Sequence, residues 1–186
     1  ITGEYYLRGV METAAGFLLK PDSSFEFFFS YGALDRTGKG NWRVKEDKLI
    51  LNSDKPGMQA FDLTTTSVVK DDFITIKITG ENAFFLSAVY AIIKCGDKEL
   101  EGQTNNKGIL QFPKQAVDSI HLYFEFAPEK KAVFTIKHTA DNFFEFRFTP
   151  TALEVFFENQ LFHLEDKEFR GALPLLKPGE YHFMKH

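Results

Sequence analysis

The side chains that could perform chemistry are spread along the chain without the spacing of a catalytic or metal-binding motif. A zinc site needs three or four closely placed His, Cys or carboxylate ligands, and the histidines are not spaced in that way. His182 and His186 lie four residues apart, but in an expected strand and tail rather than on a helix. Cys95 precedes a turn and has no neighbouring base to activate it. The sequence therefore predicts no enzyme, no metal site and no cofactor.

One segment, Tyr31–Thr37, brings together side chains suited to ligand binding. Its mixed character predicts a long loop at the rim of a barrel, and loops in such places often carry function. The Arg36 guanidinium can pair with an anionic head group through two hydrogen bonds. A surface ion pair between Asp35 and Arg36 is the structural alternative. The candidate ligand-binding residues, which would line a barrel mouth and its interior, are Tyr31, Arg36, Trp42, Phe27 and Phe146.

Alternating aromatic residues predict the elements that would position these side chains. The chain contains 22 phenylalanines, and in segments 25–31 and 143–148 aromatic residues alternate with polar ones. Because side chains alternate across a strand, each segment has one aromatic face to bury. Phe28 breaks the alternation, which predicts a strand buried on both faces, a second layer or a ligand. Nearly every other segment also resembles a short strand between turn residues, so we predict an all-β protein.

The spacing of the expected strands divides the chain into three blocks. Residues 1–67 and 139–186 each contain too few strands to close a sheet, but together they suffice for a barrel of about eight strands. Residues 68–138 have the strand spacing of a small β-sandwich. We therefore predict a split antiparallel barrel with the sandwich inserted in one loop, and we expect Trp42 to close one end of the barrel. Separate sheets arranged in a row are the alternative.

Two stretches of the sequence resemble known families. Segments Leu18–Phe25, Gly38–Val44 and Asp47–Leu51 contain an apolar strand with a Pro-Asp turn, a Gly-x-Trp and an Asp-x-Leu-x-Leu, and this order resembles bacterial lipocalin-like (calycin-type) barrels. Segments Ile74–Ile78 and Gly102–Phe112 resemble an immunoglobulin-like sandwich of the carboxypeptidase-regulatory or transthyretin-like kind. The second resemblance implies a structural domain, often extracellular or periplasmic, and no enzyme.

Composition and charge limit the partners. A net charge of −4 argues against broad nucleic-acid binding, which requires positive charge against phosphates. No apolar run approaches the ~18 residues of a membrane span. The single cysteine rules out an intrachain disulfide, which fits a reducing compartment and equally a bacterial exported protein. The chain begins at Ile1 rather than Met, consistent with a removed signal peptide or a trimmed chain. We expect a periplasmic or secreted location, and a cytoplasmic one stays open.

Two functions fit these observations. The first is a non-catalytic binding protein that holds a small apolar molecule in a Phe-lined barrel. The second is a structural or interaction module whose barrel is filled by its own side chains, and which binds a protein or a glycan through the sandwich. An internal cavity of roughly a few hundred Å³ would favour the first, and a packed interior would favour the second.

Overall fold

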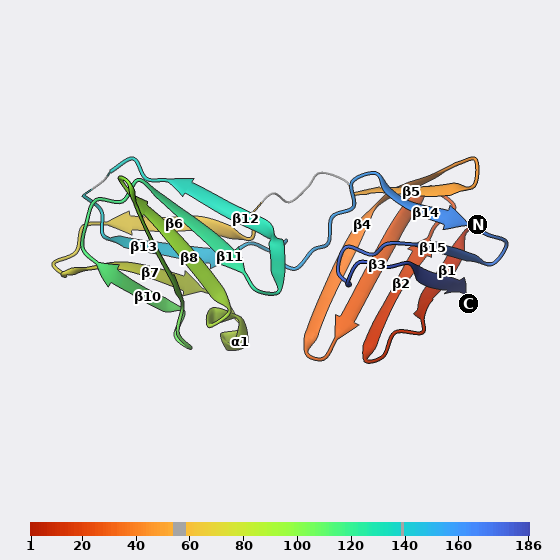
Figure 1. Cartoon of the computed structure of the whole chain (residues 1–186), viewed down its shortest axis with the longest axis horizontal. Helices are drawn as coiled ribbons and strands as arrows, with labels where there is room; N and C mark the ends of the chain where they lie inside the picture. Colours follow the sequence, from red (N-terminus) through yellow and green to blue (C-terminus); the bar gives the residue numbers. More distant parts are fainter. Residues whose placement is uncertain (54–58, 139) are drawn as a thin grey trace. The chain divides into compact units, whose positions relative to one another are not determined.

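The computed structural model, which describes residues 1–53, 59–138 and 140–186, is built from β-strands joined by turns and loops (Figure 1). Among these residues, helix is confined to α1 (Ala83–Leu86), a single turn in which the Phe84 amide donates to the Asn82 side chain. The all-β prediction is confirmed. The described residues form two compact units.

The first unit, residues 1–53 and 153–186, contains a closed antiparallel barrel of eight strands, as predicted. Strands β1 to β5 and strands β14 to β16 pair in sequence order, β5 pairs with β14, and β1 pairs with β16 to close the barrel. The two ends of the chain therefore lie side by side (red and dark blue in Figure 1). The strands in sheet order are β1 (Gly3–Arg8), β16 (Tyr181–Lys185), β15 (Glu168–Gly171), β14 (Gln160–Leu164), β5 (Lys48–Ser53), β4 (Leu34–Lys45), β3 (Ser24–Tyr31) and β2 (Thr13–Leu19).

Alternation sets which face of each barrel strand points inward. In β3, Phe25, Phe27 and Phe29 are buried, whereas Glu26 between them is exposed. The register of β2 against β3 places Phe17 opposite Phe27, and residues directly opposite each other share a face. Each inward face thus adds to one aromatic core inside the barrel.

The second unit contains two four-stranded sheets. Phe61 and Phe146 of one sheet meet Phe124 and Phe134 of the other, with ring centroids 6.5 and 4.9 Å apart, so the sheets share an aromatic core. All neighbouring strands are antiparallel except β7 and β13. In the first sheet the strands follow the order β10 (Ile109–Pro113), β7 (Phe73–Thr79), β13 (Phe143–Phe148) and β6 (Phe61–Ser67). In the second sheet the order is β12 (Ala127–Thr135), β11 (Ser119–Phe124), β8 (Val89–Cys95) and β9 (Lys98–Gln103).

Two strands that we expected in the barrel lie in the second unit. β6 and β13 pair with each other, and β13 also pairs with β7, which differs from the predicted boundaries at 67/68 and 138/139. The Asn142 side chain supports this pairing: it accepts a hydrogen bond from the Val69 amide (2.8 Å) and donates one to the Phe73 carbonyl (2.9 Å). Alternation predicts that a strand has a buried face, but it does not predict which sheet covers that face.

The expected loop between Tyr31 and Thr37 is a tight hairpin. β3 and β4 pair as far as Tyr31 and Leu34, which leaves Gly32 and Ala33 as a two-residue connection. Gly32 has a φ of 58°, which glycine adopts without steric cost and which the first central residue of a type II′ turn requires. Asp35, Arg36 and Thr37 therefore belong to β4.

Candidate functional site

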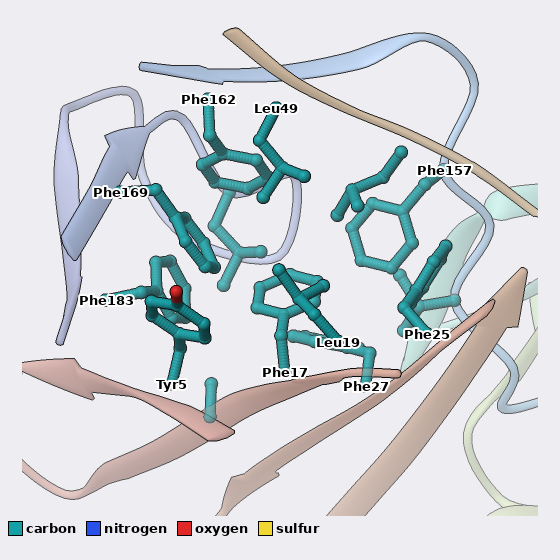
Figure 2. Close-up of a cluster of buried hydrophobic side chains, with 14 of the residues drawn as sticks. Tyr5, Phe17, Leu19, Phe25, Phe27, Leu49, Phe157, Phe162, Phe169 and Phe183 are labelled. Atoms are coloured by element: carbon teal, nitrogen blue, oxygen red, sulfur yellow. The ribbon is translucent and has the colours of Figure 1, made fainter. Parts of the chain in front are cut away.

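The interior of the barrel is occupied by its own side chains, as Figure 2 shows. Phe17 lies at the centre, with its ring centroid between 4.6 and 6.2 Å from the centroids of six other phenylalanine rings. Most of these contacts are tilted or edge-on, the arrangement that aromatic pairs prefer. The seven rings, each at most 3% exposed, are those of Phe17, Phe25, Phe27, Phe157, Phe162, Phe169 and Phe183.

The predicted ligand-binding residues do not come together in one site. Phe27 belongs to the barrel core, whereas Phe146 lies in β13 and packs in the core of the second unit. Tyr31 is 53% exposed at the end of β3. Trp42 is half-buried against the barrel core, and its Nε1 donates to the Lys20 carbonyl at 3.1 Å. These positions give Phe146 and Trp42 structural contacts.

Arg36, the predicted partner of an anionic head group, is buried at 3% exposure rather than placed on a rim. Its Nε donates to the Leu153 carbonyl (3.2 Å) and its Nη2 to the Glu154 carbonyl (3.3 Å). The same returning segment is bonded to β4 through the Val155 amide and the Thr37 carbonyl (2.7 Å). Arg36 therefore holds the returning segment against β4 at the position where the chain re-enters the barrel unit. Residues 35–37 resembled a loop because they are polar. The spacing of residues in the sequence does not reveal that the Arg36 guanidinium is buried and bonded to carbonyls.

A groove lies instead on the outer wall of the barrel, over strands β1 to β4, with a volume of about 490 Å³. It extends to Gly38 and Glu154 at the β4 end, and Phe17 and Phe27 of the core also border it. We call this surface the outer groove. Cross-strand registers arrange its outward-facing residues in two rows. One row contains Tyr6, Phe28 and Thr37, with the buried Gly16 of β2 between Tyr6 and Phe28. The other row contains Glu4, Leu18, Glu26 and Lys39.

Gly16 allows two aromatic rings to lean over β2. A Cβ atom at this position would lie 2.7 Å from Phe28 Cε1 and 3.0 Å from Tyr6 Cδ1, distances that would force both rings to move. The centroids of the Tyr6 and Phe28 rings are 6.1 Å apart with an interplanar angle of 60°. Phe28 is 39% exposed. The absence of a side chain on β2 thus creates a shelf formed by two rings.

Two carboxylates of the outer groove, those of Glu4 and Glu26, are bonded to neighbouring side chains. The Tyr6 hydroxyl donates to Glu4 Oε2 at 2.7 Å, and this bond raises the pKa of Tyr6 above its ordinary value. Lys20 Nζ contacts Glu26 Oε1 at 2.5 Å, which raises the pKa of Lys20 because the carboxylate stabilises the charged ammonium. Carboxylates at both ends of the groove and the ammonium of Lys39 make its lining mixed in charge.

Metal binding and cysteine reactivity are two other kinds of chemistry for which the described residues can be assessed. Within the described residues, no three His, Cys, Asp or Glu side chains are grouped closely enough to hold a metal ion. Cys95 is buried, and burial raises the pKa of its thiol, which disfavours the reactive thiolate. No helix in the part of the chain that the structure describes is long and apolar enough to cross a membrane.

Sequence reasoning missed the outer groove, although one signal pointed to it. Phe28 was singled out because it interrupts the alternation of β3, and it faces outward as that interruption implies. Gly16 could not be connected with Phe28 without the strand register that sets them opposite each other.

Comparison with known proteins gives no match: neither a family model, nor a curated protein, nor a solved structure matches the chain.

Proposed function

We propose that the chain is a non-catalytic binding module, in which a filled barrel serves as a rigid scaffold and the outer groove receives the ligand. The observation that carries this proposal is that the barrel unit has room for a ligand in the outer groove, whereas its interior is filled by side chains. Ligand sites are usually concavities of about 300–1,000 Å³ lined by apolar and a few polar groups, and the outer groove, at about 490 Å³, has that size and lining. Inside the barrel the ring of Phe17 contacts rings on several sides.

We also propose that the two units are a lipocalin-like barrel and an immunoglobulin-like sandwich. Strands that pair in chain order around a closed barrel support the first assignment. The second is supported by three pairings, β7 with β10, β8 with β11, and β11 with β12. They correspond to strands B and E, C and F, and F and G of an immunoglobulin fold. The position of β13 between β6 and β7 departs from that pattern.

The alternative function is a carrier of a small apolar molecule inside the barrel, with a periplasmic or secreted location. It would require the aromatic cluster to open, at the loss of ring contacts worth about 0.5–1.5 kcal/mol each. A binding module that works through the surface of the second unit would leave the outer groove without a role.

Binding measurements on groove variants test the proposal. Wild type, Phe28→Ala and the control Leu161→Ala are screened on an oligosaccharide array, a peptide array and a panel of fatty acids. Leu161 is a suitable control because it is an exposed apolar residue of β14, outside the groove. We expect a ligand that wild type and Leu161→Ala bind and Phe28→Ala does not. Binding that survives in Phe28→Ala, or no binding by wild type to any probe, would contradict the proposal.

A further inference from the structure

The lining of the outer groove restricts the chemistry of the ligand, if the proposed function holds. Its polar side chains are of both kinds. Glu4, Glu26 and Glu154 supply acceptors, whereas Lys39 and the Thr37 hydroxyl supply donors. In the row that crosses the strands, Glu26 and Lys39 are direct cross-strand partners. A ligand that fills the groove must therefore offer both donors and acceptors along its length.

The polar groups are also pre-oriented and retain bonding capacity. Glu4 accepts from the Tyr6 hydroxyl, and Glu26 from Lys20. A carboxylate has about four lone-pair sites, so one such bond fixes its orientation and leaves acceptor sites for a ligand. Side chains fixed before binding lose less conformational entropy when the ligand arrives.

The aromatic shelf adds a second kind of contact. An exposed ring face carries the negative end of the ring quadrupole, which attracts polarised C–H groups placed over it. Phe28 is 39% exposed and lines the groove together with the acceptors. A ligand with an apolar C–H face and a rim of hydroxyls matches a ring that is flanked by carboxylates and an ammonium.

Three other ligand classes fit the lining less well. A polycation would approach the ammonium groups of Lys20 and Lys39, and a polyanion would approach three carboxylates. A wholly apolar molecule would remove those charges from water without replacing their hydrogen bonds. A neutral polyhydroxylated chain avoids all three penalties.

The strand register gives the length of the ligand that fits the outer groove. Glu4 on β1 and Lys39 on β4 stand at the two ends of one row, with three strand-to-strand steps between them. At about 4.8 Å per step, the row spans about 14 Å. This length suits a short oligosaccharide rather than a single sugar.

We propose that the outer groove binds a neutral oligosaccharide, with one sugar ring stacked on Phe28 and its hydroxyl groups bonded to Glu4, Glu26 and Lys39. The proposal rests on the proposed function and narrows it to one ligand class. The roles differ along the groove: the ring supplies the stacking surface, and the charged side chains read the hydroxyl pattern.

Calorimetric titration tests this inference with neutral hexasaccharides: cellohexaose, maltohexaose, xylohexaose, mannohexaose and chitohexaose. Hexalysine and hexaglutamate serve as charged comparison ligands. We expect at least one hexasaccharide to bind wild type, with affinity nearly unchanged between about 0.05 and 0.5 M NaCl because the ligand is uncharged. Phe28→Ala should weaken binding at least about tenfold, Phe28→Tyr should retain it, and Leu161→Ala should leave it unchanged. Circular dichroism of each variant establishes that it is folded.

The outcomes separate the inference from the proposed function. Binding of hexalysine or hexaglutamate that Phe28→Ala abolishes, with no hexasaccharide bound, would overturn the oligosaccharide and leave the outer groove as a binding site. Hexasaccharide binding that is unchanged in Phe28→Ala would place the sugar elsewhere and overturn the inference. A wild type that binds none of these ligands would overturn the inference, and the array screen then decides the proposed function by itself.

Discussion

Replacing Phe17 with alanine tests how tightly the barrel interior is packed. The side chain is 2% exposed, and its ring contacts six other phenylalanine rings. Truncation of a buried phenylalanine to alanine costs about 3–5 kcal/mol. Because each lost aromatic pair adds about 0.5–1.5 kcal/mol beyond the buried area, we expect the upper end of that range. The free energy of unfolding of the barrel should therefore fall by about 5 kcal/mol in Phe17→Ala.

Urea denaturation followed by tryptophan fluorescence measures this effect. Trp42 is the single tryptophan of the chain and packs against the barrel core, so its emission reports on the barrel unit. With a slope of about 2 kcal/mol per molar urea, a loss of about 5 kcal/mol moves the midpoint by about 2.5 M. Phe146→Ala is the matched control because it removes an equally buried ring from the second unit, and the Trp42 transition should move much less.

A loss below about 1 kcal/mol in Phe17→Ala would refute the argument, since it would mean that the ring has little packing to lose. If Phe17→Ala fails to fold, Phe17→Leu provides the same comparison with a smaller change in volume. The alanine variant should also acquire an affinity for benzene that wild type lacks, because apolar cavities opened in packed cores bind such molecules.

Three further predictions concern single side chains. Arg36→Ala should lower the free energy of unfolding by about 3 kcal/mol, measured by the same urea transition, because the hydrogen bonds of a buried guanidinium to the Leu153 and Glu154 carbonyls are lost. An unchanged stability would return Arg36 to the ligand-binding candidates. Cys95 should react with Ellman's reagent much more slowly in the native protein than in urea, since burial raises its pKa, and equal rates would contradict its buried position. Asp22 accepts from the Ser24 hydroxyl and amide, which holds its pKa below the ordinary 3.8, so it stabilises the fold above that value and loses this effect as the pH falls further. The difference in stability between wild type and Asp22→Asn should therefore shrink in acid titrations below about pH 4, and a constant difference would show that Asp22 has no such role.

Several features of the fold could be predicted from the sequence because they depend on local alternation. The strand at Phe25–Phe29 was predicted with one aromatic face to bury, and that face points into the barrel. A barrel of about eight strands was also predicted and is confirmed, although the expected set did not include β15. The strand at 143–148 was also predicted, but in the wrong sheet. Its aromatic face can be buried by either sheet, and the choice depends on long-range pairing with β6 and β7.

The candidate site was less predictable because it depends on register and on single contacts. Arg36 was placed in an exposed loop because polar residues surround it, whereas the hairpin at Gly32 extends β4 and turns its side chain inward. The shelf over Gly16 requires Phe28 and Tyr6 to be its cross-strand neighbours, and register cannot be derived from one strand alone.

NMR of protein with ¹³C-labelled phenylalanine rings can show whether the barrel is filled and whether ligands bind to its outer wall. One sample contains a reporter in the outer groove, Phe28, and reporters in the interior, including Phe17, Phe162 and Phe183. Separate portions of the sample are titrated with a hexasaccharide that binds in the calorimetric experiment and with lauric acid. We expect saturable shifts of the Phe28 ring with the sugar and no saturable shifts of the interior rings with the fatty acid. Saturable shifts of Phe17, Phe162 and Phe183 with lauric acid, while Phe28 stays unchanged with the sugar, would contradict this expectation.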